Sequence, residues 1–542
     1  MSFRLLLTLT ICWISRAGAL VTLKVHLIED LVQTSCVVAA SNPNESLENS
    51  MEELARNVLN NAEIPTGLVD VAAFAREKYI RLKLANGHGL NDRSQPLLLV
   101  FERKLPDRKC LLKPDLLHRE LTAHGLAGPF HTPLLLAFIN EVCGTFLTSE
   151  GGLSPTGRRR MQILNSLYAV QRDRPSATVT LGRLSDTCGD LREFFYSGNC
   201  KHQGKGEKDH CERTDVASCA AKGISLPKCD EIHTLSSQQE FFESYVSKSK
   251  PFILKNGVRN WTALKKWSND FFRDKLRGNS VHIKLTPPVG LFEGVEPRSI
   301  WNGSGIEIPE DVLAAVQSPD LVMVRPAGVE MDFDRFIDLV EKKSPVAEKV
   351  SAYLEYTSVS SVMAGLKQDY QELPFARDIL HLQHENIWLS DGNTLGKLHF
   401  DEYDNLLCQI SGKKQVILLE PYQNEDLYEG HILEAILQYK NGSFYRNKLM
   451  ESTSMTMSPV DITQPDFKKF PRLYNVFPLN CTIDAGDLLY IPSFWWHEVQ
   501  SYPDLVEQRN LAVNFWYKPF LDKEFPCQQC KLDINKDYRH LL

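Results

Sequence analysis

The sequence predicts a mixed protein in which a separate α/β domain precedes a β-rich C-terminal half with flanking helices. In the N-terminal part, Val21–Ile28 alternates apolar and polar residues as a strand does, whereas Met51–Ala62 and Val69–Leu84 show helical periodicity. Pro96–Phe101 is a short apolar run that is typical of a buried strand. Residues 20–185 are therefore expected to form an α/β domain, and none of their motifs indicates its role.

The pattern changes from about residue 231. Gln239–Val246 and Asn260–Trp267 have helical periodicity, and Pro251–Leu254 between them resembles a short strand. Many short β-like runs follow towards the C-terminus. Residues 231–525 are thus expected to form a β-rich domain, followed by a tail at 526–542.

Composition excludes several classes of protein. The 542 residues are 43% hydrophobic and 24% charged, which is typical of globular domains and not of disordered or fibrous chains. The formal charge of −7 gives no sign of a protein that binds nucleic acid.

The first residues predict a secretory signal peptide at 1–19. Arg4 supplies a positive start, Leu5–Ile14 an apolar stretch, and Ala17–Ala19 a small-residue cleavage site. The apolar stretch is too short to span a membrane, so we expect no membrane span after cleavage. A buried N-terminal strand or helix is the alternative. The predicted location is the lumen of the endoplasmic reticulum or the extracellular space.

Cysteine usage agrees with an oxidising compartment. Twelve of the 13 cysteines remain after loss of Cys12, an even number that suits disulfides. Five of them crowd into a predicted connector at 186–230, without the close pairs of a zinc site. The lone pair Cys527 and Cys530 predicts a disulfide in the tail, with a redox pair or half a zinc site as alternatives. Five N-x-[ST] sequons, at Asn44, Asn260, Asn302, Asn441 and Asn480, are compatible with a glycoprotein.

Two short motifs predict a metal site. His399 and Asp401 are two residues apart, so on a strand both side chains face the same side. His497, which follows a pair of tryptophans, is the best candidate for a third ligand. Two histidines and one carboxylate form the facial triad of non-haem Fe(II) oxygenases, which leaves positions open for a cosubstrate and O₂. A lone H-x-D motif can also arise by chance on an exposed strand.

Lys414 is the predicted anchor for a cosubstrate. It lies on the strand-like run Lys413–Leu419, and a hairpin return would bring it back towards the metal. An oxygenase of this kind needs a cation for the distal carboxylate of 2-oxoglutarate. A desolvated lysine is costly unless it has a carboxylate partner.

Residues 386–419 and 484–517 together resemble the cupin-like branch of the JmjC-domain Fe(II)/2-oxoglutarate oxygenases. The pattern is similar to that of factor-inhibiting-HIF-type protein hydroxylases. His399, Asp401 and Asn405 fit the first family motif, and Lys414 and His497 fit the next two. The family's closing V-N-F-W-Y is met by Val513–Tyr517, with Asn514 where the family places a residue near the cosubstrate.

The resemblance extends to the cosubstrate site, with one departure. Tyr353 lies in a run similar to the family strand that carries a cosubstrate-binding tyrosine. The family often has Thr or Ser three residues before the first histidine, where this chain has Gly396. Thr394 or Tyr353 could compensate. The stretch from Gln438 to Cys481 is a long insertion and a candidate flap over the substrate.

The resemblance implies a double-stranded β-helix, the cupin or jelly-roll fold, around the metal. It implies an Fe(II) dioxygenase that uses 2-oxoglutarate and O₂ and releases succinate and CO₂, with Lys414 and Tyr353 holding the far carboxylate. The expected substrate is a protein side chain in the secretory pathway, from Lys, Asn, Asp, Arg or Pro. Alternatives are an inactive lumenal scaffold, a histone or protein demethylase, and oxidation of a small molecule or glycan.

Overall fold

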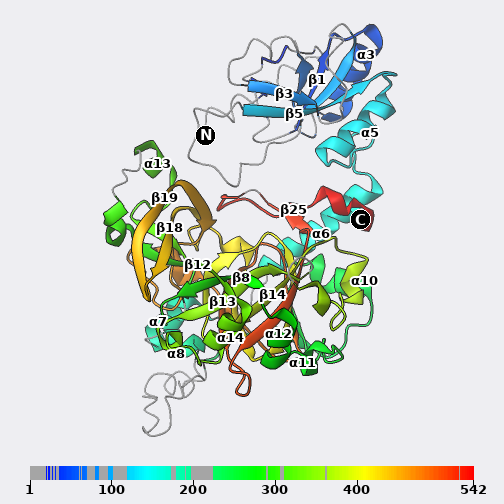
Figure 1. Cartoon of the computed structure of the whole chain (residues 1–542). Helices are drawn as coiled ribbons and strands as arrows, with labels where there is room; N and C mark the ends of the chain where they lie inside the picture. The colour runs from blue at the N-terminus through cyan, green and yellow to red at the C-terminus, as the bar shows by residue number, and fades with distance from the viewer. Residues whose placement is uncertain are drawn as a thin grey trace. The chain divides into compact units, whose positions relative to one another are not determined.

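The computed structural model of the chain describes residues 20, 22–24, 27–28, 31, 36–59, 62, 64–69, 80–84, 95–101, 119–172, 179–188, 191–196, 224–288, 291–304, 310–359, 363–523 and 525–542. These residues form two compact units (Figure 1). The first takes the described residues up to Asn165 together with Lys536–Leu542, and the second takes those from Ser166 to Asn535. The predicted signal peptide lies outside the described residues.

The first unit is built on a five-stranded mixed sheet. Its strands, in spatial order, are β2 (Thr66–Leu68), β1 (Val37–Ser41), β4 (Leu97–Phe101), β5 (Arg119–Ala127) and β3 (Ile80–Leu84). Helices α3 (Glu45–Leu54) and α5 (Thr132–Cys143) bury leucines and other apolar side chains against one face of this sheet. Asn44 caps α3 by accepting a hydrogen bond from the amide of Leu47, at 2.9 Å.

Two of the four elements predicted for this unit are confirmed. Strand β4 coincides with the predicted run at Pro96–Phe101, and α3 continues as a π-helix over Ala55–Leu59 inside the predicted helix. The strand expected at Val21–Ile28 is wrong where the run is described, because Leu27 and Ile28 are helical and, of Thr22–Lys24, Thr22 alone makes a bridge.

The helix expected at Val69–Leu84 is wrong where its end is described. Ile80–Leu84 is strand β3, parallel to β5. Its apolar residues also alternate with polar ones, so the short segment fits a strand as well as a helix, and pairing with β5 decides between them. Residues 70–79 lie outside the described residues.

The second unit contains two large sheets. The first has nine strands, in the order β12 (Ala327–Asp332), β8 (Ser280–Thr286), β13 (Ser351–Ser358), β14 (Leu382–Ser390), β23 (Asn510–Tyr517), β16 (Asp404–Ser411), β21 (Leu488–Ile491), β7 (Phe252–Leu254) and β6 (Asp230–Ile232). The second has five, in the order β20 (Leu479–Asp484), β17 (Lys413–Leu419), β22 (Trp496–Tyr502), β15 (Leu395–Phe400) and β9 (Leu291–Phe292).

A shared apolar core lies between these two sheets. Leu407, Leu489 and Ala512 come from the nine-stranded sheet, and Val416 and Ile483 come from the five-stranded one. All strands within this pair of sheets run antiparallel to their neighbours except β6 with β7 and β9 with β15. Two facing sheets of this kind form the jelly-roll that the sequence predicts.

The hairpin expected between β16 and β17 is wrong. The two strands follow one another around Gly412, but β16 pairs with β21 and β23 whereas β17 pairs with β20 and β22. Gly412 has a φ of 75°, and a Cβ there would lie 2.4 Å from the carbonyl oxygen of Tyr502. The turn therefore carries the chain from one sheet to the other, and it requires glycine.

A smaller four-stranded sheet includes much of the predicted insertion. Its strands are β10 (Gly294–Pro297), β11 (Leu321–Arg325), β18 (Gly430–Lys440) and β19 (Ser443–Met457), and the last two form a long antiparallel hairpin (Figure 1). Helix α13 (Glu310–Ala315) lies in the segment before β11. The expected role of residues 438–481 as a substrate flap stays a prediction.

Short helices cover the outside of the sheets. They are α7 (Leu181–Cys188), α8 (Leu191–Tyr196), α10 (Gln238–Phe241), α11 (Ala263–Lys266), α12 (Asn269–Leu276), α14 (Phe333–Val340) and α16 (Pro374–Arg377), with a π-helix at Phe242–Val246. The π-helix, α10 and β7 confirm the helix and strand predicted between Gln239 and Leu254. Helices α7 and α8 bury Leu184 and Phe195 against Ile417 of β17. No helix among the described residues is long and apolar enough to cross a bilayer.

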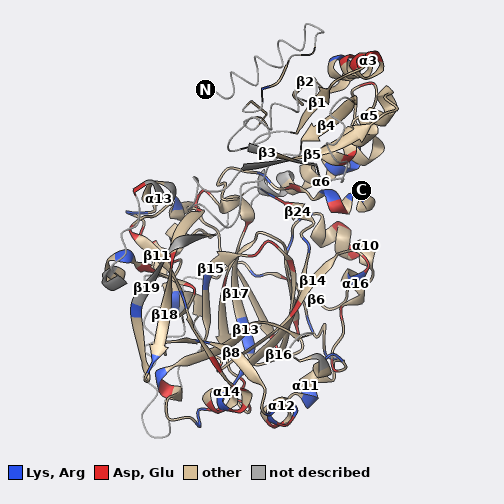
Figure 2. Ribbon diagram, turned by 45° about the horizontal axis from the view of Figure 1, so that its top comes forward, with Lys and Arg blue, Asp and Glu red and all other residues tan. Residues whose placement is uncertain are grey.

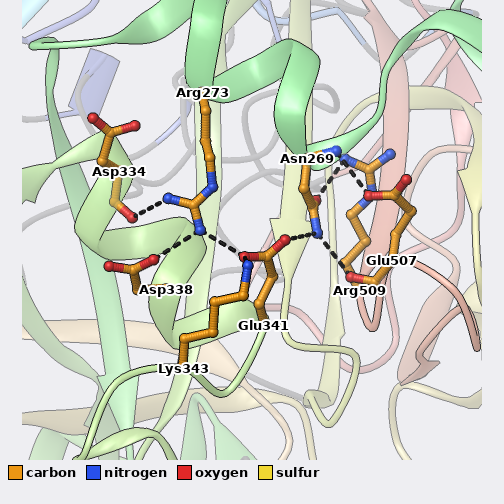
Figure 3. A network of polar contacts seen from close by, with 8 residues as sticks. All are labelled: Asn269, Arg273, Asp334, Asp338, Glu341, Lys343, Glu507 and Arg509. Carbon is orange, nitrogen blue, oxygen red and sulfur yellow. Dashed lines mark hydrogen bonds and ion pairs between the residues drawn. The ribbon is translucent and has the colours of Figure 1, made fainter.

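A polar network ties α12 and α14 to the loop that precedes β23 (Figure 3). Figure 2 shows acidic and basic residues side by side on both helices. Arg273 of α12 contacts Asp338 at 2.7 Å and Glu341 at 2.6 Å. Asn269 donates to Glu341 at 3.2 Å and accepts a hydrogen bond from the buried Arg509 at 3.1 Å. Because Arg509 directly precedes β23, the network holds the start of a strand that lines the pocket described below.

Disulfides join distant parts of each unit. The described pairs are Cys36–Cys143, Cys229–Cys481 and Cys527–Cys530, of which the last confirms the predicted disulfide in the tail. Cys188 is also disulfide-bonded. The even count of cysteines does not mean complete pairing, however, because Cys408 lies free and buried on β16.

Candidate functional site

Two neighbouring strands bring the three predicted metal ligands together. His399 on β15 is the direct cross-strand partner of His497 on β22, and their ring centroids are 4.3 Å apart. Asp401 follows β15 and places Oδ2 3.6 Å from Nε2 of His497. One ligand atom from each residue lies within 4.8 Å of the others, the only such group of three among the described residues. Two imidazoles and one carboxylate match the ligand set of a mononuclear Fe(II) site.

Backbone carbonyl groups orient both imidazoles. Nδ1 of His399 lies 2.6 Å from the carbonyl oxygen of Lys397, and Nδ1 of His497 lies 2.9 Å from that of Trp495. A carbonyl accepts only, so each Nδ1 must carry the proton and donate it. Each Nε2 is then an unprotonated donor atom for a metal. These contacts span two residues along the chain, so local strand geometry sets the tautomer.

The electrostatics favour the forms that bind a metal. Burial, together with repulsion from His497, lowers the pKa of His399. Burial alone would raise the pKa of Asp401, but the hydrogen bond and the charges of the two histidines bring it below its usual value. Neutral imidazole and ionised carboxylate are the states that a divalent cation requires.

Lys414 is a buried cation without a carboxylate partner. It is 2% exposed, and its ammonium donates to the hydroxyl of Ser501 at 2.8 Å and lies 5.8 Å from the centre of the Tyr353 ring. Burial lowers the pKa of Lys414 to about 7. No ion pair to Lys414 occurs among the described residues. A buried lysine that lines a cavity and lacks a counter-charge is suited to bind an anionic ligand.

Asn514 is the centre of an amide network on the opposite sheet. Its Oδ1 accepts from Trp388 at 2.8 Å and from Asn386 at 3.2 Å, and its amide group donates to Asn405 at 3.0 Å. These residues come from β14, β16 and β23, which are neighbours in the nine-stranded sheet. The amides are therefore held rigidly at the pocket wall.

One pocket between the two sheets is lined by all eight residues that the sequence singles out. They are His399, Asp401, His497, Lys414, Asn405, Asn514, Tyr353 and Thr394. The backbone carbonyl of Thr394 accepts from the amide of Ser501 at 2.8 Å, which links it to the hydroxyl partner of Lys414. Gly396 also lines the pocket, and a Cβ placed there would meet no atom nearer than 3.9 Å. The pocket wall is therefore open at this glycine.

Sequence reasoning missed a second wall of the same pocket. Glu293, Glu355 and Tyr356 lie there together with Trp388 and Trp516. Both tryptophans stand inside the motifs quoted above, so their neighbours could have pointed to them. Glu293 lies outside the quoted motifs. Glu355 and Tyr356 follow Tyr353 in the same run, but nothing in that run marks them as pocket residues.

Comparisons with known proteins place this site in a wider group. The model of the family described as "Cupin-like domain" matches residues 238–523, which include every residue of the candidate site. The chain is 25% identical over 292 residues to the "Bifunctional peptidase and (3S)-lysyl hydroxylase JMJD7" of Homo sapiens, covering 53% of this chain and 82% of that protein.

Two further relatives have comparable similarity. "Lysine-specific demethylase JMJ32" of Arabidopsis thaliana is 26% identical over 321 residues, or 55% of this chain and 84% of that protein. "JmjC domain-containing protein E" of Dictyostelium discoideum is 25% identical over 299 residues, or 51% of this chain and 80% of that protein. In all three, the similarity spans about half of this chain.

Proposed function

The chain belongs to the cupin-like JmjC domain family, and on this premise we propose that it is an Fe(II)- and 2-oxoglutarate-dependent dioxygenase that hydroxylates a protein side chain in the secretory pathway. The observation that carries the proposal is the meeting of His399, Asp401 and His497 in one pocket with the buried, unpaired cation of Lys414. Together these two features provide for a metal and a dicarboxylate.

Each residue has a task in this proposal. Bound Fe(II) would supply the open coordination positions at which 2-oxoglutarate and O₂ react to give succinate and CO₂. His399, Asp401 and His497 would hold the metal. Lys414, with Tyr353 and Thr394 beside it, would bind the far carboxylate, and the Asn405–Asn514 amides would orient the cosubstrate. The dry pocket between the sheets would exclude water from the reaction.

The proposed compartment has support from the disulfides. Five described cysteines outside the tail are disulfide-bonded, namely Cys36, Cys143, Cys188, Cys229 and Cys481, and structural disulfides persist in oxidising compartments. The predicted signal peptide indicates the same pathway. Sequencing the N-terminus of the mature protein tests this, because cleavage near Leu20 is expected and an intact Arg4 would contradict the assignment.

The experiment for the metal and cosubstrate is anaerobic thermal unfolding with Mn(II) and a non-reactive 2-oxoglutarate analogue. A ligand that binds only the folded state adds about 2.7 kcal/mol at a hundredfold excess over Kd. This stabilisation should occur in the wild type and be lost in His399→Ala and Asp401→Ala. The control is His282→Ala, which removes an exposed histidine of β8. An equal shift in His399→Ala would contradict the site.

A second candidate is a lumenal scaffold that keeps the fold without turnover. Gly396 favours it, because the open wall at this position lacks the hydroxyl that many family members have. Succinate release from 2-oxoglutarate, measured with candidate peptides, separates enzyme from scaffold. Methylated lysine belongs among the peptides, because JMJ32 is named a lysine-specific demethylase.

A further inference from the structure

Part of the pocket wall near the triad has an unusual composition. Glu293, Glu355, Tyr356, Trp388 and Trp516, here called the acidic–aromatic wall, line the same pocket as the triad. They come from separate parts of the chain: the turn between β9 and β10, the end of β13, and strands β14 and β23. The fold therefore gathers two acids and three aromatic rings at the opening of the proposed substrate pocket.

The backbone is distorted where it presents these side chains. In a regular strand Glu355 and Tyr356 would face opposite sides. The pairing of β13 with β14 is irregular between Leu354 and Thr357, and Tyr356 has a φ of 51°, so both side chains reach the pocket. Glu293 also has a positive φ, of 58°. A positive φ at non-glycine residues is costly and gathers where side chains are aimed at a ligand.

The two glutamates have no counter-charge of their own. Neither carboxylate makes a hydrogen bond or ion pair with another described residue. Lys284 and Arg325 act on Glu355 only through their charges, and Arg325 is occupied by a bidentate pair with Glu434 at 2.9 and 3.1 Å. Burial and the charge of Glu293 raise the pKa of Glu355 to about 8, despite the opposing influence of Lys284 and Arg325. Glu355 therefore holds a proton at neutral pH while the pocket is empty, and a cation bound beside it would favour the ionised carboxylate.

The aromatic rings form a contiguous surface next to the acids. The ring of Tyr356 is 4.8 Å from Trp388 and 5.7 Å from Trp516, and the two indoles are 6.1 Å apart. Trp516 is 7% exposed, and its indole N–H has no acceptor among the described residues. Ring faces attract cations, and their apolar area suits a long aliphatic stem. A missing acceptor for a buried N–H is a further sign of a ligand.

We infer that the acidic–aromatic wall binds the cationic side chain of a lysine or arginine residue in the substrate protein. The inference rests on the proposed function, because it takes the pocket beside the triad as the place where the substrate side chain reacts. Among the described residues no third His, Cys, Asp or Glu joins Glu293 and Glu355 in a metal-ligating group, which favours an organic cation as the occupant. An uncharged target residue would leave both carboxylates unpaired beside it.

The test is the binding of fluorescently labelled peptides that differ only at a central residue, within flanks of Ala, Ser and Gly. Lysine is compared with norleucine, and arginine with citrulline, so each pair differs in charge at nearly constant shape. The full chain, loaded with Mn(II) and the 2-oxoglutarate analogue, should bind one of the two cationic peptides about tenfold or more tightly than its neutral partner.

Two variants make the result specific. In the double variant Glu293→Gln/Glu355→Gln the preference should fall to about twofold or less, because the shape of the wall is kept and its charge is lost. The matched control is Glu330→Gln on β12, an exposed glutamate paired with His282, which should keep the preference. Equal binding of neutral and cationic peptides to the wild type, or an unchanged preference in the double variant, overturns the inference.

Stabilisation by Mn(II) and the analogue is measured on the same samples. If Mn(II) and the analogue stabilise the wild type but the protein shows no preference for a cationic peptide, only the inference about the acidic–aromatic wall is contradicted. Absence of this stabilisation in the wild type contradicts the proposed function, whatever the peptides show. Its retention in the double variant establishes that this variant is folded.

Discussion

Tyr196 donates a 2.6 Å hydrogen bond to the carboxylate of Glu498, a residue 302 positions further along the chain. Glu498 follows the candidate ligand His497 and is fully buried. Its carboxylate also contacts Lys397 at 3.0 Å, and the carbonyl of Lys397 orients His399. Helix α8, far from the triad in sequence, is thereby connected to both histidines.

Tyr196→Phe is expected to lower the free energy of unfolding by about 1–3 kcal/mol. The substitution keeps the ring and removes one hydrogen bond to a buried charge, which water cannot replace. Denaturant unfolding measures the change. Tyr445→Phe is the control, because Tyr445 is 44% exposed, and its change should be close to zero. Equal effects of the two substitutions would mean that the Tyr196 contact contributes nothing.

Lys414→Met should stabilise the empty protein and abolish cosubstrate binding. The pKa of Lys414 is lowered to about 7 by burial, so below pH 7 folding keeps an unfavourable charge in the interior. This cost disappears as the pH rises towards the ordinary lysine pKa of about 10.4. The lowered pKa corresponds to a cost of roughly 4 kcal/mol at pH 7. Because the substitution also removes the hydrogen bond to Ser501, worth about 1 kcal/mol, we expect a gain on the order of 3 kcal/mol in unfolding free energy.

The same Lys414→Met protein should lose its stabilisation by Mn(II) with the analogue. Lys413→Met provides the matched control, because that neighbour lies over the Tyr502 ring and does not line the pocket. If Lys414→Met binds the analogue as well as Lys413→Met does, another group must hold the far carboxylate.

Gly396→Thr is expected to be tolerated and to tighten analogue binding about threefold to tenfold. A Cβ at Gly396 lies 3.9 Å or more from its neighbours, and the residue does not use a left-handed φ. The added hydroxyl can supply one hydrogen bond to the cosubstrate, worth about 0.5–1.5 kcal/mol. Titration of the analogue into Mn(II)-loaded protein tests this. Gly396→Ala, which lacks the hydroxyl, should fold and show no gain.

Glu355→Gln should make the protein more stable at high pH. The folded-state pKa of Glu355 is raised to about 8 by burial and by Glu293, so the folded state prefers the neutral acid. Protonated Glu355 makes its full contribution to the free energy of unfolding below the unfolded pKa of about 4.3, and this contribution is lost as the pH rises through 8. Glutamine mimics the neutral acid at every pH. The difference between variant and wild type in urea unfolding should therefore grow between pH 5 and 9, whereas the exposed Glu330→Gln should show no such trend.

The residues that carry local motifs could be identified without the structure. The spacing of His399 and Asp401 on a strand, and the carbonyl contacts that orient each imidazole, depend on only a few neighbouring residues. The same holds for β4 and β17, whose apolar runs match the observed strands. Side-chain alternation has a period of two, so such features can be read from a short segment.

Only the tertiary structure decided which strands meet. Lys414 lines the same pocket as the triad because β17 pairs with β22 in the other sheet, and not through the expected hairpin with β16. The acidic–aromatic wall, with Glu293 from the turn between β9 and β10 and Glu355 from β13, has no local signature. The sequence determined the chemistry of the metal site, since those side chains belong to short motifs. The acidic–aromatic wall, and the support that α8 gives to the two histidines, arise instead from burial between distant segments. Burial is a property of the whole fold, and no short stretch of residues encodes it.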